Sequence, residues 1–141
     1  MVTETGASDP EVCKVVAALT PRVRHTHARV GFEEGPQVPD PRGPIWEKYM
    51  SGYMQWWQAI YAAAMARGDA VCTTTPEFGP HMYAWVRAHA PGPKVSREDT
   101  LNNIWAINHW VAKQVSRLFT EMGGKAPTVV DDPEEGNWTL A

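Results

Sequence analysis

The sequence predicts an α/β fold in which two parallel strands alternate with three helices. Segments whose apolar residues recur every three or four positions alternate with segments of period two, in the order helix, strand, helix, strand, helix. Proline, glycine and capping residues mark the joins between these segments. With 141 residues, of which 43% are hydrophobic, the chain is long enough for one domain with a core.

The first helix and the first strand precede residue 31. We expect a helix from Pro10 to about Leu19, because the Asp9 side chain can accept hydrogen bonds from the free amides of the first turn. Pro21 ends this helix. Strict alternation from Val23 to Val30 predicts a strand. One face of that strand carries Val23, His25, His27 and Arg29.

A proline-rich segment from Gly31 to Gly43 leads to the second helix. Its composition predicts a long structured loop, a type of segment that often carries function. Glu33 and Glu34 are interpreted as solvated charges of this loop. Pro44 opens the helix, and Gly68 provides its left-handed C-cap. The apolar residues that we expect on the face packed against a sheet are Ile45, Tyr49, Tyr53, Trp57, Ile60 and Ala64.

The second strand and the last helix follow. β-branched residues predict a strand from Ala70 to Thr75, which Pro76 interrupts, so that Glu77 lies at the strand end. Residues 96–99, Ser-Arg-Glu-Asp, form a capping-box pattern that predicts a helix ending at Gly123. The expected apolar stripe of this helix is Leu101, Ile104, Trp105, Val111, Val115, Leu118 and Met122.

Charge and composition exclude several functional classes. The formal net charge is -3, from 13 basic and 16 acidic residues, and the basic residues are scattered, which argues against nucleic acid as a partner. No apolar run is long enough to span a membrane. Cys13 and Cys72 have no metal or redox spacing, which suits a reducing compartment. Since no targeting signal is visible either, we expect a cytoplasmic protein.

The polar face of the first strand indicates a site. A buried strand ordinarily carries aliphatic residues there, and in a parallel barrel the ligand site gathers at the carboxyl ends of strands. His27 and Arg29 would meet Glu77 at that end. Imidazole nitrogen and carboxylate oxygen suit Mn, Co, Zn or Mg. On spacing alone, however, His-x-His is more often a structural pair of polar residues, and a carboxylate after a strand is more often a helix cap.

Several motifs resemble a known family. They are the run HTHARVGFEEGPQVPDPR from His25 to Arg42, Trp46, the run TPEFGP from Thr75 to Pro80, and the segment 102–110. Together they resemble the carboxyl-terminal part of the sugar phosphate isomerase/epimerase family, the xylose isomerase-like TIM barrels, over residues 12–119. The resemblance implies a partial TIM (β/α)8 barrel consisting of the last two strands with three helices, in which residues 23–30 are strand seven and 70–75 strand eight.

The resemblance also implies a division of the chain and a set of site residues. Residues 1–8 would be a disordered start, residues 9–124 the barrel part, and residues 125–141 a loose acidic tail. In the wider superfamily, strands four, six, seven and eight each supply one ligand to a divalent ion. By match, His27 and Glu77 are the last two metal ligands, and Glu77 is also the candidate catalytic base. His25 and Arg29 are then expected as substrate-binding residues.

The leading hypothesis is a fragment of a metal-dependent sugar or polyol isomerase/epimerase, in which a divalent ion assists proton transfer next to a carbonyl or hydroxyl. Because strands one to six are missing, we expect the isolated chain to be weakly active or inactive. The alternative is a non-catalytic fragment that associates with itself or with a protein partner. A hydrolase acting on abasic DNA is disfavoured because a basic groove is lacking.

Overall fold

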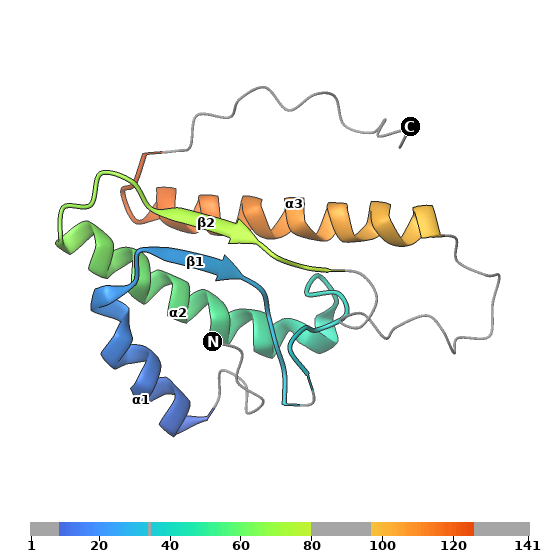
Figure 1. Ribbon diagram of the computed structural model, residues 1–141, viewed down its shortest axis with the longest axis horizontal. Helices are drawn as coiled ribbons and strands as arrows, with labels where there is room; N and C mark the ends of the chain where they lie inside the picture. Colours follow the sequence, from blue (N-terminus) through green and yellow to red (C-terminus); the bar gives the residue numbers. More distant parts are fainter. Residues whose placement is uncertain (1–8, 34, 80–96, 126–141) are drawn as a thin grey trace.

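Three helices and a two-stranded parallel sheet form a mixed α/β structure (Figure 1). The computed structural model describes residues 9–33, 35–79 and 97–125, and for residues 97–102 it describes the backbone alone. The expected start at residues 1–8 and the tail from residue 126 onward lie outside the described residues. Within them, the predicted order of elements is confirmed.

Helix α1 (Pro10–Leu19) begins as the sequence predicts. Asp9 Oδ1 accepts hydrogen bonds from the amides of Glu11, at 2.8 Å, and Val12, at 3.3 Å. Pro21 does not end the helical conformation at once, because the short 3₁₀ helix η1 (Thr20–Arg22) continues from α1. The first of the three expected helices therefore has the predicted bounds and the predicted N-cap.

The two strands are parallel neighbours, as predicted, but both are shorter than predicted. Strand β1 (His25–Ala28) pairs with β2 (Thr73–Pro76), with His25 opposite Thr73 and Ala28 opposite Pro76. The pairing of β1 is limited at both ends by other hydrogen bonds. The Val23 carbonyl accepts from Arg67 Nη2 at 2.9 Å, and the Arg29 amide donates to the His27 carbonyl at 3.1 Å.

The second strand also starts later than the sequence predicts. Ala70 to Cys72 lies outside the ladder, with the Val71 side chain 72% exposed, whereas Pro76 is the last paired residue. A proline is tolerated at the end of an edge strand because a missing amide there removes little of the ladder. The expected boundary is thus shifted by three residues at the start and by one at the end.

Helix α2 (Glu47–Ala66), which follows the 3₁₀ turn η2 (Pro44–Trp46), packs against the buried face of the sheet. Gly68 has the left-handed φ of +75° that its role as C-cap requires. The prediction for Ile45 is wrong, because its side chain is 75% exposed in the turn before the helix. The buried residues of α2 are Met50, Tyr53, Trp57, Tyr61 and Ala64.

Helix α3 (Arg97–Glu121) contacts both β2 and α2, and runs beside β2 in Figure 1. Ile104, Val111 and Val115 are buried as predicted. Trp105, expected on the same stripe, is 57% exposed, and Ile107 is buried instead. The capping box cannot be compared, because Ser96 lies outside the described residues. No described helix is long and apolar enough to cross a membrane.

The core joins the inner face of the sheet to the two long helices. Burial alternates along β1, with Thr26 and Ala28 buried and His25 and His27 exposed. The predicted loop at residues 31–43 is structured, since the Val38 amide donates to the Val30 carbonyl at 2.7 Å. The core cluster is Ala28, Val30, Val38, Met50, Tyr53, Trp57, Tyr61, Phe78, Ile107, Val111 and Val115.

Candidate functional site

The carboxyl ends of the two strands bring His27 and Glu77 together. His27 Nδ1 lies 3.0 Å from Glu77 Oε2, and both side chains are open to solvent, at 59% and 43% exposure. The parallel pairing explains this arrangement, because His27 is opposite Thr75 and Glu77 is two residues further along the same face of β2. The two expected metal ligands therefore point to the same side of the sheet.

Arg29 joins this pair from the end of β1. Its Nη2 lies 3.4 Å from Glu77 Oε1, and its Nε donates to the Glu77 carbonyl at 2.7 Å. The guanidinium is mostly buried, with 15% of the side chain exposed, so it is less screened than the other two side chains. Glu77 is thus contacted at its carboxylate and at its backbone by the same residue.

His25 lies further back on the same face, and threonine hydroxyls contact both of its ring nitrogens. Nδ1 is 2.8 Å from Thr73 Oγ1, and Nε2 is 3.4 Å from Thr75 Oγ1. The His25 and His27 rings meet edge to face, with centroids 4.9 Å apart. These contacts fix the His25 ring against β2, at the side of His27 rather than at Glu77. We refer to His25, His27, Arg29 and Glu77 as the strand-end cluster.

Sequence reasoning missed two residues that hold the chain just after Glu77. The side-chain amide of Asn108 binds both backbone groups of Phe78, and that of Gln37 binds both backbone groups of Gly79. Gln37 is only 2% exposed. Asn108, which is partly buried, interrupts an apolar helix stripe, and an amide in such a stripe is a signal that could have been used. Gln37 stands in the proline-rich loop, where its burial could not be read from the sequence pattern.

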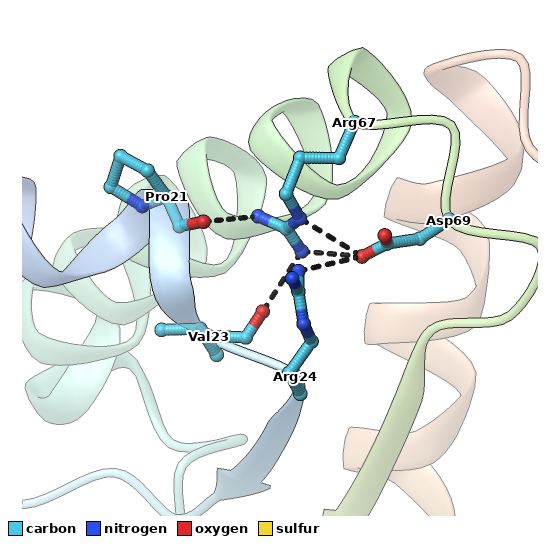
Figure 2. A network of polar contacts seen from close by, with 5 residues as sticks. All are labelled: Pro21, Val23, Arg24, Arg67 and Asp69. Atoms are coloured by element: carbon cyan, nitrogen blue, oxygen red, sulfur yellow. Dashed lines mark hydrogen bonds and ion pairs between the residues drawn. The ribbon is translucent and has the colours of Figure 1, made fainter.

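The opposite ends of the strands carry an arginine-centred network, drawn in Figure 2. Arg67 Nη1 donates to the Pro21 carbonyl at 2.8 Å, and Nη2 donates to the Val23 carbonyl at 2.9 Å. Arg67 Nε also donates to Asp69 Oδ2 at 3.1 Å, while Arg24 Nη1 lies 3.3 Å from the same oxygen. The guanidinium of Arg67 lowers the pKa of Asp69. We call these five residues the arginine clamp.

Glu33 is exposed, as expected of a loop charge, but it also has a hydrogen-bond partner on α2. Its Oε2 accepts a hydrogen bond from the Tyr49 hydroxyl at 2.5 Å, and this bond lowers the pKa of Glu33. Lys48 Nζ lies 4.4 Å from the centre of the Tyr49 ring. Glu34 lies outside the described residues. Glu33 does not belong to the strand-end cluster.

His27 Nδ1 and Glu77 Oε2 are in direct contact at 3.0 Å, the distance of an ion pair or hydrogen bond. Two ligands at right angles on an ion, with bonds of about 2.1 Å, would lie about 3.0 Å apart as well. The nitrogen and oxygen donors suit Mn, Co, Mg or Zn. Across the described part of the chain, however, no three His, Cys, Asp or Glu side chains gather closely enough to hold an ion. His27 and Glu77 could therefore supply two ligands of a larger set.

A groove of about 810 Å³ lies along β2, α2 and α3. Its walls include Tyr61, Val71, Val115 and Phe119, so it is mainly apolar, and it is separate from the strand-end cluster. Burial raises the pKa of Tyr61, whose hydroxyl lies 2.6 Å from Thr74 Oγ1.

Comparisons of the chain with protein-family models, with curated protein sequences and with solved structures found no match.

Proposed function

We propose that the chain carries the last two strands of an incomplete parallel barrel and, on them, half of a divalent metal site of the sugar isomerase/epimerase type. The observation that carries the proposal is the 3.0 Å approach of His27 Nδ1 to Glu77 Oε2 at the carboxyl ends of neighbouring parallel strands. In parallel barrels the chemistry lies at that end. The motif resemblance described above supports the same two residues.

Three of the four side chains of the strand-end cluster have a role in this proposal. His27 and Glu77 would hold the ion, which when bound would polarise substrate oxygens as a Lewis acid. Glu77 would also accept a proton, and Arg29, which is mostly buried beside it, would orient a substrate oxygen. The positive charge of Arg29, 3.4 Å from Glu77 Oε1, opposes a second cation at this carboxylate, so we expect weak metal binding.

Metal binding should therefore depend on His27 and Glu77. We expect the purified chain to bind Co²⁺ weakly, and Glu77→Gln and His27→Asn each to lower the affinity by at least about tenfold, because supporting residues alone are worth about 10–100-fold. Absorption spectroscopy during Co²⁺ titration measures this. Glu33→Gln is the matched control, since Glu33 is an exposed carboxylate bound to Tyr49 rather than to the cluster. Unchanged affinity in Glu77→Gln would contradict the proposal.

The second candidate is a non-catalytic fragment that associates with a second copy of itself. Among the described residues each strand has a single neighbour, so each keeps an unpaired edge, and the apolar groove runs beside β2. Exposed edges and apolar surface favour association. Cys13 and Cys72 are not joined in a disulfide, which is consistent with the cytoplasm, the compartment that we propose for either candidate.

Activity measured against oligomeric state distinguishes the two candidates. We expect the monomer to show little or no epimerisation of aldoses or ketoses with Mn²⁺, Co²⁺ or Mg²⁺. The reason is that two ligands neither fix an ion nor enclose a substrate, and orientation alone supplies about 7–11 kcal/mol of barrier reduction. Size-exclusion chromatography with assays of each fraction measures this. Turnover by the oligomer alone would indicate a site assembled between copies, and efficient turnover by the monomer would refute the fragment interpretation.

A further inference from the structure

We infer that Gln37 and Asn108 are positioning residues, which hold Glu77 against His27 by binding the backbone that follows it. This inference builds on the proposed function, because it assigns Glu77 its supports. Three consecutive residues, from Glu77 to Gly79, have backbone groups bound by side chains from three different segments. Arg29 comes from the end of β1, Asn108 from α3 and Gln37 from the loop between β1 and α2.

Asn108 binds Phe78 as a neighbouring strand would. Its Oδ1 accepts from the Phe78 amide at 2.8 Å, and its Nδ2 donates to the Phe78 carbonyl at 2.8 Å and to the Ile104 carbonyl at 3.1 Å. Both donor positions of the Asn108 side chain are therefore used, and its oxygen accepts one hydrogen bond. Since Phe78 is 4% exposed, the bonds are shielded from competing water.

Gln37 repeats this arrangement one residue further on. Its Oε1 accepts from the Gly79 amide at 2.8 Å, and its Nε2 donates to the Gly79 carbonyl at 3.1 Å. A fully buried amide that forms two bonds to one residue is held in a single orientation. Its loop is anchored in turn, because Val38 pairs with Val30 at the end of β1. Gln37 thus ties the segment after β2 to the segment after β1.

These bonds set the position of Glu77 relative to His27. The ladder holds the chain as far as Pro76, and the two amides hold it from Phe78 onward, so the Glu77 backbone is fixed on both sides. The Glu77 side chain therefore starts from a fixed position, from which its carboxylate reaches His27 Nδ1 at 3.0 Å. Residues that hydrogen-bond to a metal ligand directly change metal affinity by about 10–100-fold, and we expect the lower end of this range for residues that act through the adjoining backbone.

Near-isosteric variants separate positioning from simple stabilisation. Gln37→Met and Asn108→Leu remove the hydrogen bonds at similar volume. Gln37→Ala and Asn108→Ala remove the same bonds without adding charge and leave room for water at the freed backbone groups, so they serve if the first pair fails to fold. Val115→Ala, a core truncation on α3 away from the cluster, is the control for loss of stability alone.

The first readout needs no metal. The ¹⁵N chemical shifts of the His27 ring at fixed pH report on its contact with Glu77, because hydrogen bonding sets which ring nitrogen carries the proton. In folded Gln37→Met and Asn108→Leu, or in the alanine variants, we expect these shifts to move toward those of Glu77→Gln. Val115→Ala should leave them unchanged. Wild-type His27 shifts in folded variants of both residues would overturn the inference.

The second readout is the Co²⁺ titration described above. We expect Gln37→Met and Asn108→Leu each to lower the affinity by about tenfold, and Val115→Ala to leave it unchanged. If the wild-type chain binds no Co²⁺, the proposed function fails, and the His27 shifts alone decide whether the two amides position Glu77. If Co²⁺ binds and the variants bind it equally well, the positioning role is refuted while the metal site stands.

Discussion

Replacing Trp57 with alanine is expected to lower the free energy of unfolding by about 3–5 kcal/mol. The indole is 3% exposed and belongs to the core cluster between α2, the sheet and α3, where its ring contacts Tyr53. Removing it leaves a cavity that the helices and the sheet can fill only in part. Because whole domains have stabilities of about 5–15 kcal/mol, the variant should be largely unfolded at modest urea concentrations.

Trp105→Ala provides the matched control for this substitution. The residue type is the same, but the side chain is 57% exposed on α3, so we expect a loss below about 1 kcal/mol. Urea denaturation followed by circular dichroism measures both variants. Equal losses would mean that the packing of one of the two long helices differs from that described here.

Arg67→Ala should cost about 2–3 kcal/mol, because it leaves two backbone carbonyls of the arginine clamp without their charged donor. Those carbonyls belong to Pro21 and Val23, so the change affects the segment that leads into β1. Arg67→Lys should recover only part of the loss, since an ammonium cannot reproduce the planar arrangement of donors. The measurement is again urea denaturation, and Arg117→Ala is the control.

The control relies on a pair of a different kind. Arg117 contacts Glu121 on the surface of α3, with both side chains more than half exposed, and pairs of this type contribute about 0.3–0.5 kcal/mol.

The arginine clamp also predicts that the free energy of unfolding depends on pH in the acid range. The pKa of Asp69 is lowered, so its contribution is complete above the unfolded value of 3.8 and is lost as the pH falls through the folded value. Arg67→Ala should weaken this dependence, and a loss as small as that of Arg117→Ala would contradict the role of the clamp.

The order of elements could be predicted from the sequence because it depends on local signals. Asp9, Pro44 and Gly68 act within one turn of their own helices, and the structure places all three at helix ends. The strand limits could not be predicted in this way. The start of β1, for example, depends on Arg67, whose side chain binds the Val23 carbonyl from 44 positions away in the sequence.

The candidate site was predictable in part for the same reason. His27 and Glu77 stand out because polar residues at strand ends break an apolar pattern, and the parallel register places them on one face. Gln37 and Asn108 escape such reasoning, because each binds backbone groups, which every residue possesses. Likewise Trp105 and Ile107 both fit a helical stripe, and only the position of α3 against its neighbours decides which of them is buried.

The arginine clamp has a consequence for the order of folding. Arg67 binds Val23 and Pro21, which precede it by 44 and 46 positions in the sequence. These bonds can form only after the end of α2 has met the segment before β1. Closing such long loops costs chain entropy, so we expect these bonds to form late in folding. Arg67→Ala should then raise the unfolding rate more than it lowers the folding rate, and the clamp would chiefly lengthen the lifetime of the native state.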